Sequence, residues 1–472
     1  MMRSSVESFR RKSVVGISRT WREIKGRARR TFKGSIHPDL PREDIDYLRT
    51  KMAECVEGKG GEASARARTE ELGLIYKNLS TKGKRIFLRR LAQDFTVDID
   101  SLIGILEELK GATGDISRLN VEHRLRKALD SPRLLILRHF NTLPDGFKFL
   151  VDMRADLLEL GGDDPYMESL EKDLKYLLKN WFDVGLLELQ EMTWESPALL
   201  LEKLILYEAV HEIKSWADLK NRLDSDRRCF AFFHGKMPYE PLIFIEVALT
   251  RGIASTIHQL LDEAEEPVDP GEADTAVFYS ISNTQKGLAG ISLGNFLIKR
   301  VAGRLSEELP TVKTFVTLSP VPGFRKWLDG KLTAGDQSIF TAKEVLEINQ
   351  LGTGENAADT LMSLLNSGWH TDAYTRDTLE TILMRLMARY LFTEKKDRRA
   401  IDPVAHFHLS NGARVERINW LADTSEKGLA QSAGMMVNYL YSLKHIDDNH
   451  EAYASEGVVP ASKAVKDYAR SI

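Results

Sequence analysis

The spacing of apolar residues changes near Thr193, and this change limits which folds the chain can adopt. Between residues 36 and 190, apolar residues recur three and four positions apart, as in "TKGKRIFLRRLAQDF" and "YMESLEKDLKYLLKNW". This spacing is typical of amphipathic helices. After Thr193, short apolar runs rich in Val, Ile and Phe are typical of strands. The sequence therefore predicts an all-α domain over 36–190 and an α/β domain over 191–472.

Four runs in the second domain have the composition of strands, and a helical stripe separates the last two. The runs are "RCFAFFH" (228–234), "EPLIFIEVALT" (240–250), "TAVFYSIS" (275–282) and "VKTFVTLS" (312–319). The stripe places six apolar residues on one helix face: Leu293, Phe296, Leu297, Val301, Leu305 and Leu309. Two neighbouring strands beside a strand–helix–strand unit predict a mixed sheet flanked by helices.

The sequence predicts helices again from 324 to 396. A last strand is predicted over "AHFHLSNGA" (405–413), and a C-terminal helix over "EKGLAQSAGMMVNYLYSL" (426–443). The stretch "GTGENA" (352–357) resembles a dinucleotide-binding fingerprint, but it follows a helical pattern rather than a strand. We therefore interpret it as the end of one helix and the start of the next.

Composition and charge exclude several classes of protein. Residues 1–34 hold eleven lysines and arginines against two glutamates and lack the apolar core of a secretory signal. Residues 1–35 are therefore predicted to be a disordered basic arm on a cytoplasmic protein; the alternative is a mitochondrial transit peptide. No apolar stretch approaches the roughly 20 residues of a membrane span, so no membrane association is expected. No basic stripe with interleaved aromatic residues continues into the body, so nucleic-acid binding is not expected.

The cysteine content also limits the class of protein and the cellular compartment. The chain has only two cysteines, Cys55 and Cys229. They are too few for a disulfide framework or a cysteine-based metal cluster, and they fit a reducing compartment.

The loop "HGKMPYEP", which follows the first predicted strand, carries more functional groups than a turn needs. The imidazole of His234, the ammonium of Lys236 and the phenol of Tyr239 lie within six residues. Loops at the mouth of a buried sheet often bind ligands. The alternative is a surface turn whose polar side chains have no ligand, with Lys236 simply solvated. Both interpretations stay open from the sequence, and ligand binding is favoured.

A glycine-rich turn, "NTQKGLAGISLG" (283–294), leads from a strand into a helix. Its glycines at 287, 290 and 294 let the backbone approach a ligand closely. The following helix offers free N–H groups and the positive end of its dipole, which suit a phosphate or pyrophosphate. Tight packing alone would explain the same glycines.

Ser319 and two histidines are further candidates. In "LSPVPGF" (318–324), the proline after Ser319 holds its backbone extended, so the hydroxyl is either presented at a strand tip or part of a structural turn. In "HFH" (406–408), two histidines share one face of the predicted strand. No further ligand motif accompanies them, so one catalytic or hydrogen-bonded histidine is favoured over a metal site.

Five stretches together resemble the malonyl-CoA decarboxylase family in order and spacing. Spanning residues 230 to 423, they are "FFHGKMPYEPLIFIEVALT", "FYSISNTQKGLAGISLGNFLIKRV", "TLSPVPGF", "DPVAHFHLSNGA" and "RINWLAD". The resemblance implies a self-associating helical N-terminal domain and a catalytic domain with the acetyltransferase-like (GNAT-type) fold. It also implies conversion of malonyl-CoA to acetyl-CoA and carbon dioxide without a metal or other cofactor.

The resemblance also implies roles for single residues. The family's catalytic serine and histidine fall on Ser319 and His408. The position where this fold grips the pyrophosphate of coenzyme A falls on Gln285, Lys286, Gly287, Leu288, Ala289 and Gly290. The polar residues of 234–239 become candidate partners for the acyl group or the phosphates. Some family members carry a glutamate where this chain has Ser292, which leaves open which group orients His408.

The chemistry of decarboxylation suits a serine and a histidine. Loss of carbon dioxide from a malonyl thioester leaves an enolate, which hydrogen-bond donors shielded from bulk water stabilise. An apolar pocket disfavours the leaving carboxylate more than it disfavours neutral carbon dioxide. A histidine, with a reference pKa of roughly 6.5, can supply the proton that the carbanion needs.

Two other functions remain open from the sequence. An acyl-CoA N-acyltransferase on the same fold would need an amine acceptor. A non-catalytic protein that binds coenzyme A would use the helical domain as a scaffold for partners. The resemblance further implies a homotetramer built as a dimer of dimers. Residues 36–190 have apolar helical stripes and no catalytic cluster, which agrees with a domain that packs against other domains or other copies of the chain.

Overall fold

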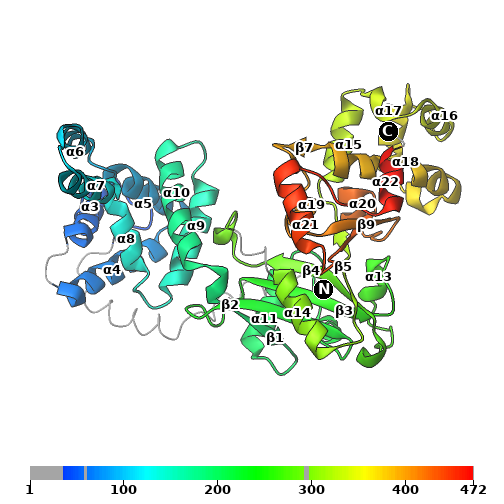
Figure 1. Cartoon of the computed structure of the whole chain (residues 1–472), viewed down its shortest axis with the longest axis horizontal. Coiled ribbons are helices and arrows are strands. Elements are labelled where there is room, and N and C mark those ends of the chain that lie inside the picture. The colour runs from blue at the N-terminus through cyan, green and yellow to red at the C-terminus, as the bar shows by residue number, and fades with distance from the viewer. Residues whose placement is uncertain (1–35, 58–60, 292–296, 471–472) are drawn as a thin grey trace. The chain divides into compact units, whose positions relative to one another are not determined.

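The computed structural model describes three stretches of the chain: 36–57, 61–291 and 297–470. It divides into two compact units (Figure 1). The first unit runs to Glu188 and also takes in residues 233–240 and 285–292, while the second holds the rest of the chain. Both predicted ligand loops thus pack with the helices of the first unit. The predicted basic arm lies outside the described residues.

The first unit is built from helices, as the sequence predicts. They are α3 (Arg42–Glu57), α4 (Gly61–Asn78), α5 (Thr81–Asp94), α6 (Ile99–Gly111), α7 (Asp115–Leu129), α8 (Pro132–Phe140), α9 (Gly146–Leu160) and α10 (Pro165–Trp181). Capping residues fix their starts: the side chains of Ser80 and Asp98 accept backbone N–H bonds at the first turns of α5 and α6. In the core, Tyr76 meets Phe87 and Phe149 edge to face.

An eight-stranded mixed sheet runs through the second unit (Figure 1). Its strands are β1 (Leu187–Met192), β2 (Arg227–His234), β3 (Ile243–Thr250), β4 (Thr275–Asn283), β5 (Thr314–Thr317), β6 (Ser319–Pro320), β9 (Arg414–Asn419) and β10 (Met436–Leu440). The order is β1-β2-β3-β4-β5-β10-β6, and β9 pairs with β10. β4 runs parallel to β5, with Thr275 opposite Thr314, whereas β2–β3 and β3–β4 are antiparallel. The predicted helical region followed by a mixed sheet flanked by helices is confirmed.

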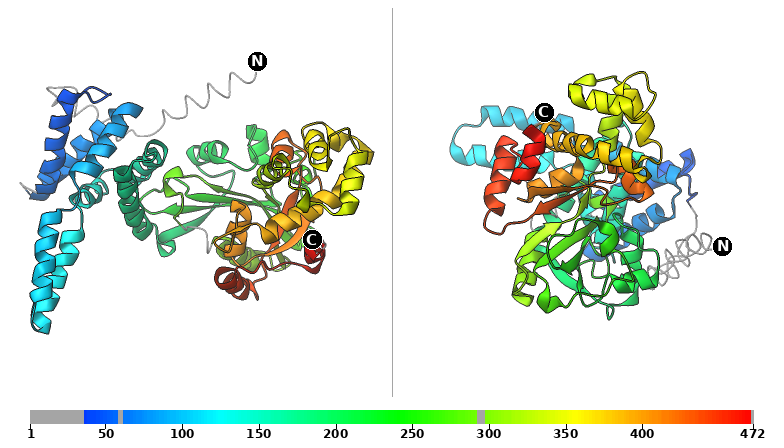
Figure 2. Two further views of the ribbon diagram at one scale, coloured as in Figure 1. Left: turned by 90° about the horizontal axis from the view of Figure 1, so that it is seen from above. Right: turned by 90° about the vertical axis from the view of Figure 1, so that its right-hand side faces the viewer.

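Helices pack around this sheet, and those numbered α15 to α18 gather at the end of the unit that holds β9 and β10 (Figure 2). The helices are α11 (Ala198–Tyr207), α12 (Trp216–Asn221), α13 (Ile257–Leu260), α14 (Leu297–Glu308), α15 (Phe324–Thr333), α16 (Ala342–Gln350), α17 (Ala357–Leu365), α18 (Ala373–Thr393), α19 (Pro403–Ser410), α20 (Glu426–Ser432), α21 (Ile446–Glu451) and α22 (Lys463–Arg470). A short hairpin joins β7 (Lys395–Lys396) to β8 (Arg399–Ala400). Among the described residues, no helix has both the length and the apolar composition to cross a membrane.

The predicted amphipathic helix between β4 and β5 is confirmed. α14 buries Leu297, Val301 and Leu305 on one face. Leu293 and Phe296, which the sequence places on the same stripe, lie outside the described residues. A helical crossover of this kind is what a parallel pair of strands requires.

The prediction for "GTGENA" is also confirmed. One helix, α16, ends at Gln350, and the next, α17, begins at Ala357. The side chain of Asn356 accepts hydrogen bonds from the N–H groups of Ala358 and Asp359, so this residue caps the second helix.

The predicted strand over 405–413 is wrong, because most of this segment belongs to α19. Asp402 caps the helix through the N–H groups of Val404 and Ala405, and Pro403 stands at its first position. This pairing of an N-cap aspartate with a proline is a helix start. This start signal outweighs the strand-like composition of the short apolar run, because the spacing of apolar residues in so short a run does not distinguish a strand from a helix.

The predicted C-terminal helix over 426–443 is wrong in its second half. α20 ends at Ser432, where Ala433 and Gly434 adopt positive φ values of 51° and 78°. The chain then forms β10, which pairs with β5, β6 and β9. Long-range pairing of "MVNYL" into the sheet decides its conformation, and helical spacing in the sequence does not reveal this.

Candidate active site

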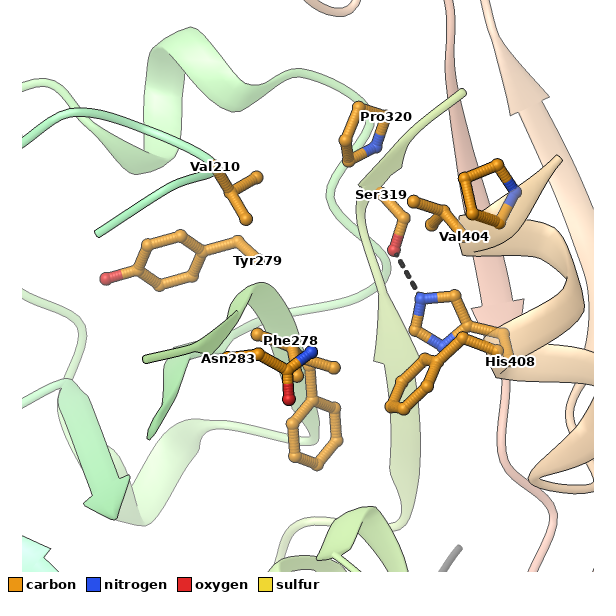
Figure 3. A pocket seen from close by; sticks show the side chains of 11 residues that line it. Val210, Phe278, Tyr279, Asn283, Ser319, Pro320, Val404 and His408 are labelled. Atoms are coloured by element: carbon orange, nitrogen blue, oxygen red, sulfur yellow. Dashed lines mark hydrogen bonds between the residues drawn. The ribbon is translucent and has the colours of Figure 1, made fainter. Parts of the chain in front are cut away.

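Ser319 and His408 meet in the second unit, although they lie 89 residues apart in sequence. Ser319 Oγ is 3.0 Å from His408 Nε2, as Figure 3 shows by a dashed line. Both side chains are buried, with 5% and 2% of their surface exposed. The two residues that the family resemblance singles out are therefore in direct hydrogen-bond contact.

Secondary structure fixes both partners. Ser319 begins β6, which pairs with β10 so that Ser319 stands opposite Val437. His408 lies in the last turn of α19, and its ring stacks on Tyr439 of β10 with the ring centroids 4.5 Å apart. β10 therefore supports the serine by backbone pairing and the histidine by ring stacking.

A directed chain of hydrogen bonds runs through the pair. Ser319 Oγ donates to Thr317 Oγ1 (2.9 Å), which also accepts from the backbone N–H of Tyr439. Because a serine hydroxyl has one proton, the contact with His408 requires Nε2–H to donate to Ser319 Oγ. His408 Nδ1 then accepts from Tyr441 O–H, 2.8 Å away. Tyr441 is thus the group that orients His408, and the imidazole proton sits on Nε2.

Burial controls the charge of His408. Removal from water disfavours the imidazolium and lowers the pKa of His408 to about 3. The histidine of the ligand-free protein is therefore neutral at physiological pH.

A pocket of about 330 Å³ opens beside the pair. Its lining residues are Val210, Phe278, Tyr279, Ile281, Asn283, Ser319, Pro320, Pro403, Val404, Phe407 and His408. Among these described residues none has a carboxylate, an ammonium or a guanidinium group. Such a site can hold a small acyl group and offer it hydrogen bonds in an otherwise apolar setting.

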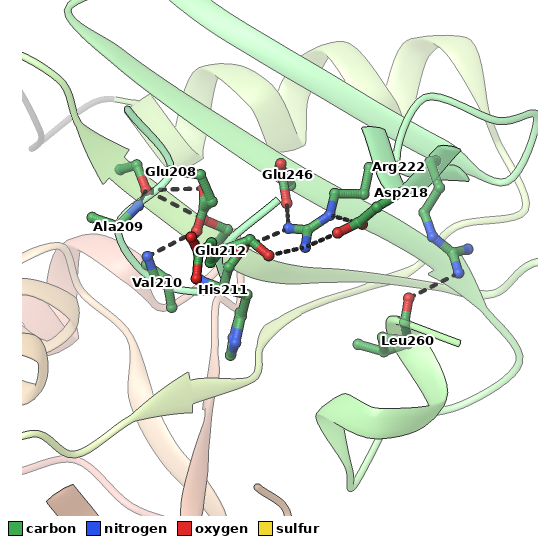
Figure 4. A network of polar contacts seen from close by, with 12 residues as sticks. Glu208, Ala209, Val210, His211, Glu212, Asp218, Arg222, Glu246 and Leu260 are labelled. Carbon is green, nitrogen blue, oxygen red and sulfur yellow. Dashed lines mark hydrogen bonds and ion pairs between the residues drawn. The ribbon is translucent and has the colours of Figure 1, made fainter. Parts of the chain in front are cut away.

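A buried polar network supports one wall of this pocket (Figure 4). Glu208 accepts hydrogen bonds from the hydroxyls of Ser280 and Ser282 in β4, and from the N–H groups of Val210 and His211. These bonds hold the segment that carries Val210 against β4, the strand that carries the pocket residues Phe278, Tyr279, Ile281 and Asn283.

The same network continues through an arginine. Arg222 forms ion pairs with Asp218 at 2.7 Å and with Glu246 at 3.1 Å. Burial nevertheless raises the pKa of Glu246 to about 8. Arg222 thus lies between the carboxyl groups of Asp218 and Glu246, whereas the partners of Glu208 are hydroxyl and backbone N–H groups.

The second histidine of "HFH" points elsewhere. His406 Nδ1 forms a hydrogen bond with Tyr453 Oη at 2.9 Å, whereas His408 contacts Ser319. Residues two positions apart project to different sides of a helix, so the shared face predicted for a strand does not exist. Within the described residues, no group of three or more histidine, cysteine, aspartate or glutamate side chains could hold a metal ion.

The loop 233–240 packs within the first unit. The ring of His234 stacks on Phe147 at 4.7 Å and lies 5.1 Å from Phe182, and its Nδ1 accepts the N–H of Lys236. His234 is only 6% exposed, so its imidazole packs in the interior of the first unit and does not face solvent. Lys236 and Tyr239 instead present their side chains to solvent.

The glycine-rich turn also packs against the helices of the first unit. A Cβ atom at Gly287 would lie 1.8 Å from the backbone oxygen of Val151, so glycine is needed for close packing against α9. The buried Arg154 donates to the carbonyls of Gly287 and Ala289 and secures the turn. Gly287 therefore has the structural role that the sequence left open.

The rest of the turn combines buried and exposed residues. Gln285 and Leu288 are buried, and Lys286 and Ala289 are exposed. Gly290 is also exposed, with a φ of +69°, and a Cβ atom there would lie 3.1 Å from Lys175 Nζ. Ser292 lies outside the described residues.

Sequence reasoning missed three residues that contact Ser319 or His408. Thr317 lies two positions before Ser319, so strand alternation puts both side chains on one face, and that signal was available. Tyr439 and Tyr441 fall in the segment predicted to be a helix. Their contacts with His408 depend on strand pairing that no local pattern shows.

Two family models match the chain. The malonyl-CoA decarboxylase C-terminal domain matches residues 185–471, and the malonyl-CoA decarboxylase N-terminal domain matches residues 95–182. The chain belongs to the malonyl-CoA decarboxylase family. It is accordingly an enzyme of the carboxy-lyase class.

Individual family members are similar over most of the chain. The mitochondrial malonyl-CoA decarboxylase of Anser anser anser is 40% identical over 418 residues, which cover 85% of this chain and 83% of that protein. Crystal structures of malonyl-CoA decarboxylases from Rhodopseudomonas palustris and Agrobacterium vitis match with TM-scores of 0.81 and 0.80. Each is 41% identical and is matched over 89% of this chain and 99% of its own. The similarity therefore extends through both domains of the family.

Proposed function

We propose that this enzyme converts malonyl-CoA to acetyl-CoA and carbon dioxide through a thioester enolate, with Ser319 and His408 as its catalytic residues. The observation that carries the proposal is their hydrogen-bonded pair beside a pocket without charged lining residues. The family, and the names of the relatives, support malonyl-CoA as the substrate.

The pocket favours loss of the carboxylate. A malonyl carboxylate placed there finds no ammonium or guanidinium group among the described lining residues, while the carbon dioxide that leaves is neutral. Desolvation therefore opposes the reactant ion more than the product. As the C–C bond breaks, its electron pair moves into the thioester as an enolate, and the Ser319 hydroxyl can turn from Thr317 to donate to this developing charge.

His408 supplies the proton that completes the reaction. Its Nε2–H faces Ser319 at the pocket, and this proton is transferred to carbon 2 of the enolate. A neutral ring that gave up this proton would become an imidazolate, so His408 first takes a proton from water at Nδ1. The negative charge that malonyl-CoA brings into the pocket favours this imidazolium and raises the pKa of His408 from its ligand-free value. Transfer of the Nε2 proton then returns the ring to its neutral form. The chain, the substrate and one proton from water account for every step, so the proposed reaction needs no cofactor.

Turnover in deuterated water tests this function. With malonyl-CoA as the only substrate, we expect acetyl-CoA that carries one deuterium in its methyl group, together with one equivalent of carbon dioxide. Product formation that depends on an added amine would instead indicate an N-acyltransferase. Binding without any turnover would indicate a scaffold for coenzyme A.

The glycine-rich turn and its neighbours are proposed to bind the phosphates of coenzyme A. Lys286 is exposed in the turn, and Lys175 Nζ lies over Gly290. Two ammonium groups beside exposed backbone suit a pyrophosphate. Of the three candidates in the loop 233–240, Lys236 and Tyr239 face solvent and can contact the same ligand, whereas His234 is engaged in packing.

Replacing either Lys175 or Lys286 by alanine should raise the Michaelis constant for malonyl-CoA about fivefold, because a part-exposed ion pair contributes about 1 kcal/mol. The turnover number should stay unchanged. Lys172→Ala is the control, since Lys172 is exposed on the same helix as Lys175 and pairs with Glu168. Calorimetry with coenzyme A checks the affinity directly, and unchanged binding in both variants would place the phosphates elsewhere. A valine at Gly290 is a poorer test, because a φ of +69° strains it whatever binds there.

The helical domain is proposed to assemble the chain into a homotetramer built as a dimer of dimers. The hairpin of α6 and α7 leaves six large apolar side chains exposed: Ile99 (61%), Ile103 (50%), Leu106 (42%), Ile116 (80%), Leu119 (63%) and Leu129 (56%). Within one chain, Arg124 of α7 already pairs with Glu108 of α6, and Arg118 pairs with Glu122. Two copies of the hairpin can therefore pair through contact between their exposed apolar side chains.

Aspartate at both Ile116 and Leu119 should dissociate this assembly, because two charges would then be buried in an apolar interface. Light scattering should report a mass below that of the tetramer. Leu346→Asp is the control, since Leu346 is 65% exposed on α16 in the second unit. A variant of unchanged mass, or a wild-type protein that is monomeric, would contradict the proposal.

The word mitochondrial in the name of a relative describes that protein. The cytoplasmic location of this chain stays a prediction.

A further inference from the structure

Contact between Ser319 and His408 depends on two separate segments of the second unit. Ser319 is followed by the turn that leads into α15, and His408 belongs to α19. A shift of either segment would open the 3.0 Å contact between the two side chains. Errors of about 1 Å in such positions can lower a rate about 100-fold.

One carboxylate bonds to both segments. Asp402 Oδ1 accepts from the N–H groups of Val404 and Ala405 at the start of α19, each at 3.0 Å. Its Oδ2 accepts from the N–H of Gly323 at 3.0 Å and from Tyr390 O–H at 3.5 Å. Gly323 lies four residues after Ser319, so the two oxygens divide their bonds between the serine segment and the histidine helix.

Capping alone does not require this arrangement. Asp98 and Asp372 also cap helices in this chain, and both are exposed. Asp402 is only 1% exposed, and burial of a carboxylate is costly unless every lone pair finds a donor. The second oxygen, which reaches Gly323, distinguishes this cap from the other two.

The segment approaches Asp402 so closely that position 323 has no room for a side chain. A Cβ atom at Gly323 would lie 2.3 Å from Tyr390 Oη and 3.1 Å from Asp402 Oδ2. The φ of Gly323 is −91°, which any residue adopts. Glycine is therefore needed here for close approach and not for an unusual backbone.

We propose that Asp402 is a positioning residue, which sets the separation of Ser319 and His408 by holding the N–H of Gly323 and the first turn of α19 on one carboxylate. The inference rests on the proposed function, because it assigns Asp402 a role through the catalytic pair. Asp402 itself need not touch the substrate.

Asp402→Asn tests the role with little change in size or capping, since asparagine caps helices as well as aspartate does. An amide has one oxygen and one NH₂ group, so whichever way it turns, one of the two segments loses its acceptor. We expect the turnover number to fall about 10- to 100-fold and the Michaelis constant to stay within about twofold. Asp372→Asn, the same change at an exposed cap of α18, should leave both unchanged.

A second pair of variants tests the link from the other side. Gly323→Ala should lower turnover, because its methyl group meets the Tyr390 hydroxyl. Adding Tyr390→Phe removes that oxygen, so the double variant should recover to within about threefold of Tyr390→Phe alone. A purely destabilising effect of Gly323→Ala would not be reversed in this way.

Combination with Ser319→Ala separates this inference from the proposed function. In that background Asp402→Asn should change turnover less than about twofold, because the separation it sets no longer matters. The inference is overturned if Asp402→Asn alone keeps wild-type turnover, if it loses no more than Asp372→Asn does, or if Tyr390→Phe fails to restore Gly323→Ala. Wild-type activity in Ser319→Ala alone would instead overturn the proposed function.

Discussion

Replacing Ser319 by alanine should lower the turnover of malonyl-CoA about 10²- to 10⁴-fold, the range for a positioned acid–base or electrostatic group. The substitution removes the hydroxyl that donates to the developing enolate and that contacts His408 Nε2 at 3.0 Å. Alanine fits the same backbone, because Ser319 pairs with Val437 through main-chain contacts of β6 and β10.

Affinity for coenzyme A should stay near wild type in Ser319→Ala, since Ser319 lies at the acyl pocket. Single-turnover kinetics with radiolabelled malonyl-CoA, together with calorimetric binding of coenzyme A, separate the chemical step from binding. Ser410→Ala is a matched control, because Ser410 donates only to the carbonyl of Phe407 on α19 in the described contacts. If Ser319→Ala keeps more than about a tenth of wild-type activity, the role assigned to Ser319 is wrong.

Loss of the His408 imidazole should lower turnover to a similar extent, about 10²- to 10⁴-fold, because the enolate then lacks its proton donor. His408→Ala removes the ring, but it leaves a cavity against Tyr439, with which the ring stacks at 4.5 Å. His408→Gln fills more of that space and is the better variant. His406→Gln is the control on the same helix, because His406 bonds to Tyr453 and not to Ser319.

The dependence of kcat/KM on pH adds a test of the charge on His408, since this ratio reports groups of the free enzyme. Burial lowers the pKa of His408 to about 3, so no inflection from this histidine is expected near pH 6.5. An inflection near 6.5 that vanishes in His408→Gln would contradict the buried neutral ring.

The free energy of unfolding should depend on pH because of the same lowered pKa of His408. The unfolded chain binds a proton on His408 near pH 6.5, whereas the folded protein resists protonation until about pH 3. Protonation therefore favours unfolding as the pH falls through this window. The free energy of unfolding should decline less steeply between these values in His408→Gln than in the wild type.

The sequence by itself predicted that helices precede the mixed sheet, and it named Ser319 and His408 as candidates for the reacting groups. Helical and strand spacing are local properties, so they separate the helices of 36–190 from strands such as β3 and β4. The Ser-Pro pair at 319 and the histidine at 408 stand in motifs that the family resemblance reveals. Malonyl-CoA decarboxylase membership was accordingly visible before any tertiary contact was known, and the family models confirm it.

Only the tertiary structure decided how these groups work. "MVNYL" has helical spacing yet becomes β10, because its partners β5, β6 and β9 come from distant parts of the chain. That pairing brings Tyr439 and Tyr441 to His408, and burial there sets the charge of the imidazole. Local spacing records which side of an element is apolar, whereas pairing partners and solvent exclusion depend on contacts between residues far apart in sequence. For that reason the sequence could name the histidine, but the fold determines its tautomer and its pKa.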